Sequence, residues 1–265
     1  MSEVATALGP TSLRPTSVGG DTIAMMGRSI RLSIRNMDAL FTALFLPVML
    51  MLLFVYLFGG AIETGTEYVT YVVPGVIVLC AGFGSSLTAV AVTQDMNGGI
   101  MDRFRSMDIS GAAVLGGHVV ASIARNLLST VLVLVVAFLI GFRPEAGGLD
   151  YLAAIAVLLL FVLAFSWVAA AVGVLTKSAE AAGGFTFFIM FLPYPSSAFV
   201  PIDTMPTWLH GFAEHQPFTP VIESVRGLLP DLPVGNAPWL ALAWCGGILT
   251  AAVAASGYLF RRRIS

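Results

Sequence analysis

Residues 68–94 read YVTYVVPGVIVLCAGFGSSLTAVAVTQ, a run without one charged side chain. A helix needs about 20 apolar residues to cross the roughly 30 Å hydrocarbon core of a bilayer, and a charge at its centre costs about 2.5–3.5 kcal/mol on insertion scales. This run therefore predicts a transmembrane helix. The sequence contains further charge-free runs at residues 39–62, 126–142, 151–176, 181–202 and 232–260. The shortest of them, 126–142, reaches the required length only with residues upstream of Arg125. We therefore predict an all-α polytopic membrane protein with six transmembrane helices over residues 39–260.

The composition agrees with a membrane protein. Hydrophobic residues make up 57% of the chain and charged residues 11%, against about 25% charged residues in soluble domains. Both cysteines, Cys80 and Cys245, lie inside predicted spans, which argues against a disulfide scaffold, a haem attachment motif or a cysteine zinc cluster. Residues 1–20 are rich in Ser, Thr, Pro and Gly and lack the apolar core of a signal peptide. They predict a disordered cytoplasmic tail.

The distribution of Lys and Arg predicts the orientation. Six spans place both ends of the chain on one side, where most of the basic residues then lie: Arg14, Arg28, Arg31, Arg35, Arg103, Arg105, Lys177, Arg261, Arg262 and Arg263. The opposite side has Arg143 and Arg226, and Arg125 falls within a predicted span. The positive-inside rule makes both termini cytoplasmic, including the short tail 261–265. A five-span arrangement is the alternative, and it would separate Arg261–Arg263 from the N-terminal arginines.

Residues 21–38 predict an amphipathic helix before the first span. Apolar residues recur there at steps of three and four, and Arg28, Arg31 and Arg35 lie on a different face. Two interpretations are open. The helix is either an anchor on anionic inner-leaflet lipid or a lever that a cytoplasmic partner moves.

The longest predicted cytoplasmic connection is residues 94–117. Gly98 and Gly99 precede a short helical pattern with an apolar side and a charged surround. The residues of interest are Gly98, Met101, Asp102, Arg103, Phe104, Arg105 and Asp108. A short helix of this composition that projects from two spans suits a docking knob, and the alternative is an ordinary amphipathic loop at the interface.

Residues 193–238 form a proline-rich region on the predicted extracellular side. Prolines this dense forbid one continuous helix but leave room for short ones. We predict that Thr219 caps one of these, with Pro220 at its first position and an apolar stripe within residues 221–229. Trp208 and Trp239 suit the interfacial aromatic belt. The pattern favours a half-re-entrant structure that lines a gate or vestibule over a plain loop.

The sequence offers no catalytic motif. Lys177 lacks the glycines of a P-loop, and His210, Glu214 and His215 lack the spacing of a zinc site. We therefore expect no catalytic residue, no metal and no cofactor bound by this chain. Residues 84–86 predict a small-residue helix contact.

A polar stripe follows the third predicted span. His118, Ser122, Arg125 and Ser129 recur at steps of four, three and four. Either Arg125 snorkels to the inner headgroups, or the stripe faces the bundle interior beside a translocation route. The stripe lacks an acidic partner in sequence. Acidic residues are also missing from the middle of every predicted span, which argues against a proton- or sodium-coupled carrier.

The order of these features resembles a known family. Residues 95–106 read DMNGGIMDRFRS, Gly117-His118 enters the third span, and residues 199–209 and 216–226 read FVPIDTMPTWL and QPFTPVIESVR. Together with the amphipathic lead-in helix, they resemble the type-2 ABC export permeases, specifically the daunorubicin-resistance-like branch of drug and lipid exporters. The resemblance covers about residues 28–263.

The resemblance implies a half-transporter that works with other chains. The partners would be two ATP-binding subunits, which bind ATP and Mg, and a second permease, either a homodimer partner or a paralogue. Residues 94–117 would be the coupling segment, with its coupling helix over residues 101–108. Residues 21–38 would be the connecting helix, and residues 221–229 part of the extracellular re-entrant helices.

The resemblance also implies a substrate and a location. A lipophilic drug, antibiotic or lipid would leave across the bacterial inner membrane. It would pass between the two permeases, along the first, second and fifth spans, where Phe185, Phe188 and Phe191 of the fifth span offer an aromatic surface. The polar stripe on the third span adds Ser122 and Arg125 as candidate path residues. Two alternatives remain: an ATP-independent channel or secondary carrier, and a membrane-embedded lipid-modifying enzyme that would need clustered polar groups.

Overall fold

Within the described residues the secondary structure is helical throughout. The computed structural model describes residues 45, 47–62, 64–98, 111–230 and 233–264. The helices are η1 (Phe54–Phe58, π-helical), α3 (Tyr68–Asn97), α5 (Gly111–Leu139), α6 (Gly148–Leu175), α7 (Ala179–Phe191), η2 (Ile202–Thr204, 3-10), α8 (Thr207–His215), α9 (Phe218–Leu228) and α10 (Ala237–Ile264). The predicted all-α class is confirmed. The tail 1–20, the connecting helix 21–38 and residues 99–110 of the coupling segment lie outside the described residues.

Four helices of the described part are long and apolar enough to cross a membrane: α3, residues 114–139 of α5, α6, and α10. Each coincides with a predicted charge-free run. Helices Pro47–Phe58 and α7 are apolar but shorter, and they fall in the predicted first and fifth spans. The 30 residues of α3 extend about 45 Å at 1.5 Å per residue. Because the hydrocarbon core is only about 30 Å thick, α3 extends beyond it.

Two boundaries differ from the sequence prediction. The predicted connection 94–117 is helical at both ends, because α3 continues to Asn97 and α5 begins at Gly111. Arg125 therefore lies inside α5. Its Nη2 donates to the Gly84 carbonyl oxygen of α3 at 3.2 Å, so the charged side chain has a polar partner inside the bundle and does not end the helix.

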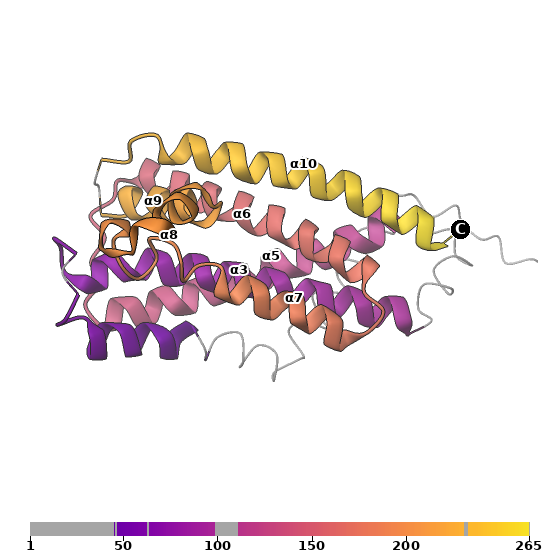
Figure 1. Ribbon diagram of the computed structural model, residues 1–265, viewed down its shortest axis with the longest axis horizontal. Helices are drawn as coiled ribbons and strands as arrows, with labels where there is room; N and C mark the ends of the chain where they lie inside the picture. Colours follow the sequence, from indigo (N-terminus) through magenta and orange to yellow (C-terminus); the bar gives the residue numbers. More distant parts are fainter. Residues whose placement is uncertain (1–44, 46, 63, 99–110, 231–232, 265) are drawn as a thin grey trace, which may run out of the picture.

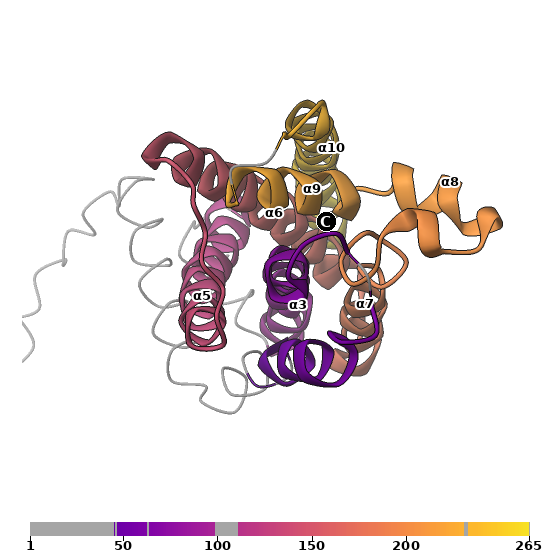
Figure 2. The ribbon, with the colours of Figure 1, turned by 90° about the vertical axis from the view of Figure 1, so that its left-hand side faces the viewer.

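Helix α3 is the central element of the bundle. Helices α3, α5, α6, α7 and α10 run side by side along the long axis, and α8 and α9 lie at one end (Figure 1). Seen end-on, α3 lies among α5, α6 and α7, with α10 beyond α6 (Figure 2). Accordingly, α3 contacts α5, α6, α7 and α9. Most of its residues are buried, whereas most of those in α10 are exposed.

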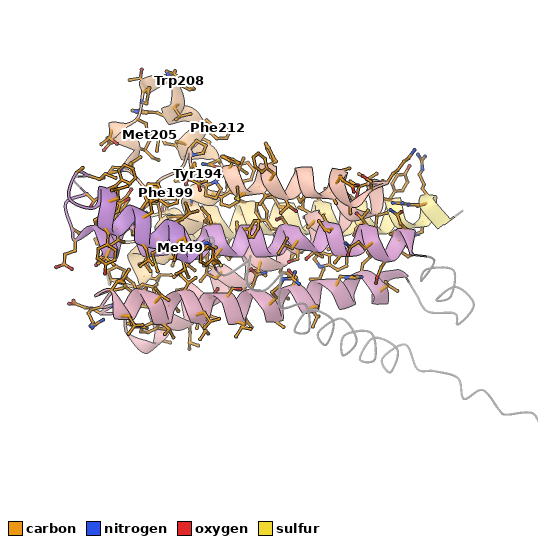
Figure 3. The ribbon with its side chains drawn as sticks, turned by 90° about the horizontal axis from the view of Figure 1, so that it is seen from below. Met49, Tyr194, Phe199, Met205, Trp208 and Phe212 are labelled. Atoms are coloured by element: carbon orange, nitrogen blue, oxygen red, sulfur yellow. The ribbon has the colours of Figure 1, made fainter. Side chains whose placement is uncertain are left out.

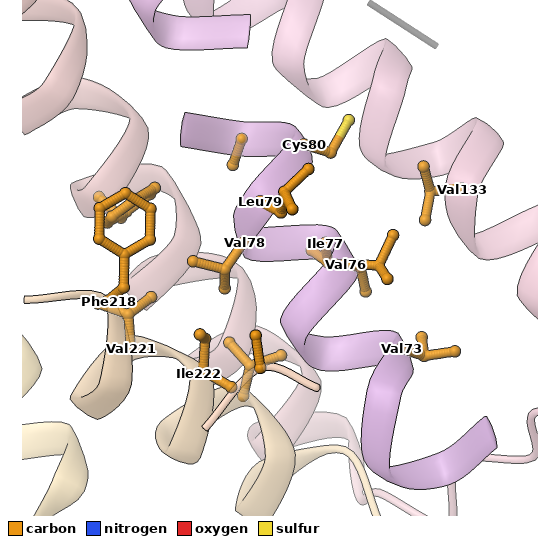
Figure 4. Packing of buried hydrophobic residues seen from close by; sticks show 14 of the residues in the cluster. Val73, Val76, Ile77, Val78, Leu79, Cys80, Val133, Phe218, Val221 and Ile222 are labelled. Atoms are coloured by element: carbon orange, nitrogen blue, oxygen red, sulfur yellow. The ribbon is translucent and has the colours of Figure 1, made fainter. Parts of the chain in front are cut away.

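Helix α9 packs into the hydrophobic core beside α3. Phe218, Val221 and Ile222 are fully buried and face α3 (Figure 4). The Phe218 ring meets those of Phe161 and Phe165 edge-on, with centroids 5.1 and 5.2 Å apart. This geometry favours aromatic pairs beyond their burial of area. The predicted apolar stripe within 221–229 is thus confirmed as a core surface.

The predicted cap of α9 is wrong. The helix begins at Phe218, and its N-cap is Pro217. The Thr219 hydroxyl instead donates to the Ala213 carbonyl of α8. The reason is that α8 ends just before α9 and brings an unpaired carbonyl of its last turn to Thr219, so the side chain joins the two helices.

Helix α8 projects from the bundle. Among the described elements it contacts only η2 and α9. Met205, Trp208 and Phe212 mark this projection, away from Met49 on the bundle (Figure 3). The Trp208 side chain is 80% exposed, which suits the predicted interfacial position without testing it.

Candidate functional site

The end of the bundle at the coupling segment is held together by polar contacts. Gly98 follows the last residue of α3, and its N–H donates to the Gln94 carbonyl. Asn97 Nδ2 donates to the Lys177 carbonyl at 2.8 Å. Arg263 Nη2 of α10 donates to Asn97 Oδ1 at 3.3 Å, and its Nη1 donates to the Thr176 carbonyl at 2.9 Å. These contacts, which we call the inner clasp, join the ends of α3, α6 and α10.

A second contact at this end joins α3 to α5. His118 Nε2 of α5 lies 3.2 Å from Asp95 Oδ2 of α3, and both side chains are mostly buried. The expectation that the polar stripe lacks an acidic partner is therefore wrong. The partner was missed because Asp95 lies just beyond the charge-free run, whereas α3 continues past it to Asn97 and places it beside His118 of α5.

The polar stripe of α5 faces the bundle interior. Ser166 Oγ of α6 donates to Ser122 Oγ at 2.8 Å, and Arg125 reaches the Gly84 carbonyl of α3. Asn126, which the sequence reasoning did not select, is buried and donates to the Ser122 carbonyl at 2.9 Å. The stripe thus contacts α3 on one side and α6 on the other. That it borders a translocation route stays a prediction.

The small residues 84–86 of α3 allow this close contact. A Cβ atom at Gly84 would lie 2.4 Å from Asn126 Oδ1, so a larger residue fits there only if the Asn126 side chain shifts. Small residues let membrane helices approach closely enough for such polar contacts. The periodicity of four between Ser122 and Asn126 was the signal that could have found the amide.

The phenylalanines of α7 do not share one surface. Phe185 is partly buried against the core, whereas Phe188 and Phe191 are 60% and 48% exposed. Phe187, also missed from the sequence, is 61% exposed and has its ring centroid 4.6 Å from that of Phe191. The exposed aromatic surface of α7 is therefore formed by Phe187, Phe188 and Phe191.

Ring contacts continue from this surface toward the predicted first span. The Tyr194 ring lies 5.7 Å from Phe191 and 5.2 Å from Phe199. Phe199 in turn stacks on Phe54 of η1 at 4.2 Å, and Figure 3 shows Tyr194 and Phe199 at the base of the projection. The aromatic series links α7 to η1.

The predicted path residues fall into two separate groups. Ser122 and Arg125 lie on α5, and the phenylalanines lie on α7, with α3 between the two helices (Figure 2). Within the described part of the chain, no contact joins α5 to α7. The structure therefore does not bring these residues together in one protomer. The described residues also contain no group of three or more His, Cys, Asp or Glu side chains that could hold a metal.

Long apolar helices joined by buried polar contacts indicate a multi-pass membrane protein. A family model described as ABC-2 type transporter matches residues 21–229. The chain belongs to this family, which comprises membrane permease components of ABC transporters, and the resemblance drawn from the sequence is confirmed.

The chain is also similar to two permeases of drug resistance. It is 30% identical over 186 residues to the daunorubicin resistance ABC transporter permease protein DrrB1 of Streptomyces coeruleorubidus. This match covers 69% of this chain and 66% of the relative. It is 23% identical over 229 residues to the probable doxorubicin resistance ABC transporter permease protein DrrC of Mycobacterium tuberculosis. That match covers 86% of this chain and 83% of the relative.

Proposed function

We propose that this chain is the permease subunit of an ATP-driven exporter that moves a lipophilic drug, antibiotic or lipid out across the bacterial inner membrane. Membership of the ABC-2 type transporter family is the observation that carries the proposal. A separate ATP-binding subunit, present in two copies, would bind ATP and Mg and supply the energy. A second permease, a homodimer partner or a paralogue, would complete the pathway.

The inner end of the bundle supports a mechanical connection to that subunit. The coupling segment, residues 94–117, begins within α3 and ends within α5, so both of its ends belong to long helices. Asp95 of α3 and His118 of α5 lie within ion-pair distance of each other and join the two helices. A push on the coupling segment would therefore move α3 and α5 together rather than deform a loose loop. The connecting helix, with Arg28, Arg31 and Arg35, would contact the same partner.

The proposed topology has six spans and two cytoplasmic termini. Lys177 and Arg263 lie with Asn97 at the clasped end of the bundle, which agrees with a cytoplasmic face under the positive-inside rule. Helices α8 and α9 would form the extracellular re-entrant region. Pro47–Phe58 and α7, extended by neighbouring residues or by a thinner local bilayer, would be the first and fifth spans.

A lipophilic substrate suits the exposed aromatic surface of α7. Two relatives are named for resistance to daunorubicin and doxorubicin, and flat aromatic molecules stack on phenylalanine rings. Because Phe188 and Phe191 face away from the core, they would meet substrate only at the interface with a second permease. Ser122 and Arg125 would act from the other side of α3, on helix positions rather than on the substrate itself.

A purification of the tagged chain in mild detergent from its native membrane tests the proposal. We expect a P-loop ATPase to be captured in stoichiometric amount, with turnover that lipophilic compounds stimulate. In a matched preparation, Arg103→Glu plus Phe104→Ala should abolish capture and export while the chain still inserts in the membrane. Capture of the chain alone, with export unchanged in the double variant, would favour an ATP-independent channel or carrier.

A further inference from the structure

The end of the bundle opposite the inner clasp contains a buried arginine. Arg226 of α9 is 7% exposed. Its Nε donates to the Tyr71 carbonyl at 3.1 Å, its Nη2 to the Ser197 carbonyl at 2.6 Å, and its Nη1 to Glu223 Oε1 at 2.5 Å. The guanidinium also lies 3.8 Å from the centroid of the Tyr71 ring. One side chain thus joins α9, α3 and the turn that follows α7.

Two tyrosines of α3 strengthen the same junction. The Tyr71 hydroxyl donates to the Ser197 carbonyl at 3.0 Å, and the Tyr68 hydroxyl donates to the Phe199 carbonyl at 2.9 Å. Gly75 allows the turn to approach, because a Cβ atom there would lie 2.4 Å from the Ala198 carbonyl oxygen. We call Tyr68, Tyr71, Arg226 and the turn 197–199 the outer lock.

The geometry of the outer lock requires an arginine. Burying a charge is costly unless each of its donors finds a partner. The rigid guanidinium fork reaches three acceptors in three different chain segments, whereas the single ammonium group of a lysine cannot occupy these positions together. An arginine that served only to place a charge near Glu223 would not need the two carbonyl oxygens.

We propose that Arg226 is a positioning residue that locks residues 193–229 to α3, so that α3 transmits movement from the coupling segment to the outer end of the bundle as one continuous helix. The transmission role rests on the proposed function, whereas the lock itself does not. Helix α3 is continuous from the outer lock to Asn97. Movements at the inner and outer ends of the bundle would therefore act on the same helix.

Thiol labelling tests the lock in the detergent-solubilised chain. In a background with Cys80→Ala and Cys245→Ala, Ser197→Cys places a thiol under the lock. The Ser197 hydroxyl makes no hydrogen bond in the structure, so this change leaves the lock intact. We expect a water-soluble maleimide to label this cysteine slowly. Loss of charge-assisted hydrogen bonds should accelerate labelling by about tenfold to 100-fold in both Arg226→Ala and Arg226→Lys.

Arg143 provides the matched control. Its Nη1 also donates to backbone carbonyls, those of Phe138 and Phe142, but both residues are close to Arg143 in the chain, at and just after the end of α5. Arg143→Ala should leave the labelling rate unchanged. Equal rates for the unmodified, Arg226→Lys and Arg143→Ala proteins would overturn the lock.

Transport per ATP hydrolysed tests the transmission role in the complex with the captured ATPase. In Arg226→Lys we expect ATP turnover to persist while export per ATP falls by about tenfold, the lower bound expected for the lock. Rapid labelling together with normal export per ATP would make the lock structural only and overturn transmission. If no ATPase is captured, the proposed function fails and transmission falls with it, whereas the labelling result still decides the lock.

Discussion

The contact between α3 and α6 predicts a sharp difference between two glycine substitutions. Gly173 lies where α6 meets α3, and a Cβ atom there would be 2.7 Å from both the Ala89 carbonyl oxygen and Val92 Cβ. The carbon pair would be about 0.8 Å short of ordinary contact at 3.5 Å. Two helix backbones would have to separate, because the obstructing atoms are not the far ends of flexible side chains.

The size of the effect follows from three terms. Overpacking of a tight contact costs about 1–3 kcal/mol. Separation of the helices would also break the 3.2 Å hydrogen bond from Thr93 Oγ1 to the Gly173 carbonyl, which costs about 0.5–1.5 kcal/mol. Replacement of a helical glycine by alanine returns about 1 kcal/mol. Gly173→Ala should therefore destabilise the protein by about 0.5–3.5 kcal/mol.

Gly116 of α5 is the control, because a Cβ atom there meets nothing within 4 Å. Gly116→Ala should therefore only gain the higher helix propensity of alanine, which stabilises the protein. Cys80 and Cys245 are both buried, so a fluorogenic maleimide reports thermal unfolding of the purified chain. We expect Tm to fall by about 1–14 °C in Gly173→Ala and to stay level or rise by about 2–4 °C in Gly116→Ala. Equal Tm values for the two variants would refute the tight contact.

Three further predictions use the same preparations. Phe218→Ala leaves a cavity at a fully buried site and should lower the free energy of unfolding by about 3–5 kcal/mol. Phe212→Ala, on the projecting helix, should change it by less than about 0.5 kcal/mol. Similar losses of Tm in the two variants would contradict the assigned core. Ser122→Ala leaves Ser166 without its 2.8 Å partner, so the double variant with Ser166→Ala should be more stable than additivity predicts by about 0.6–1.7 kcal/mol; strict additivity in thermal unfolding would exclude the contact. Phe188→Ser, at a 60% exposed position, should raise cellular accumulation of a fluorescent lipophilic dye with Tm unchanged, and unchanged accumulation would remove this residue from the path.

Hydropathy was sufficient to find the long helices but not their ends. Residues 68–94 were recognised as a span because no charge interrupts them, yet α3 continues past Asp95 to Asn97. A charge ends the hydrophobic run in the sequence but does not end a helix that extends beyond the hydrocarbon core. The same limit applies to Arg125, whose charge is accommodated by a carbonyl of a neighbouring helix.

The contacts between helices were beyond sequence reasoning for a different reason. The inner clasp joins Asn97 to Arg263, and the outer lock joins Tyr71 to Arg226. No local periodicity relates residues so far apart in the chain. The polar stripe was predictable because its members share one helix face, but its partners Asp95 and Ser166 belong to other helices. The split of the predicted path between α5 and α7 likewise depends on the position of α3 between them.

The central position of α3 has a consequence for biogenesis. This helix is synthesised early, yet the residues that cover it include Phe218 and Arg226, which leave the ribosome more than a hundred residues later. During that interval its outer tyrosines, Tyr68 and Tyr71, must face lipid or a chaperone. Among the described contacts of the inner clasp, those of Arg263 form last, because Arg263 belongs to α10, the last described helix. A chain not yet synthesised through α10 would therefore lack the Arg263 contacts at the end of the bundle where the coupling segment joins it.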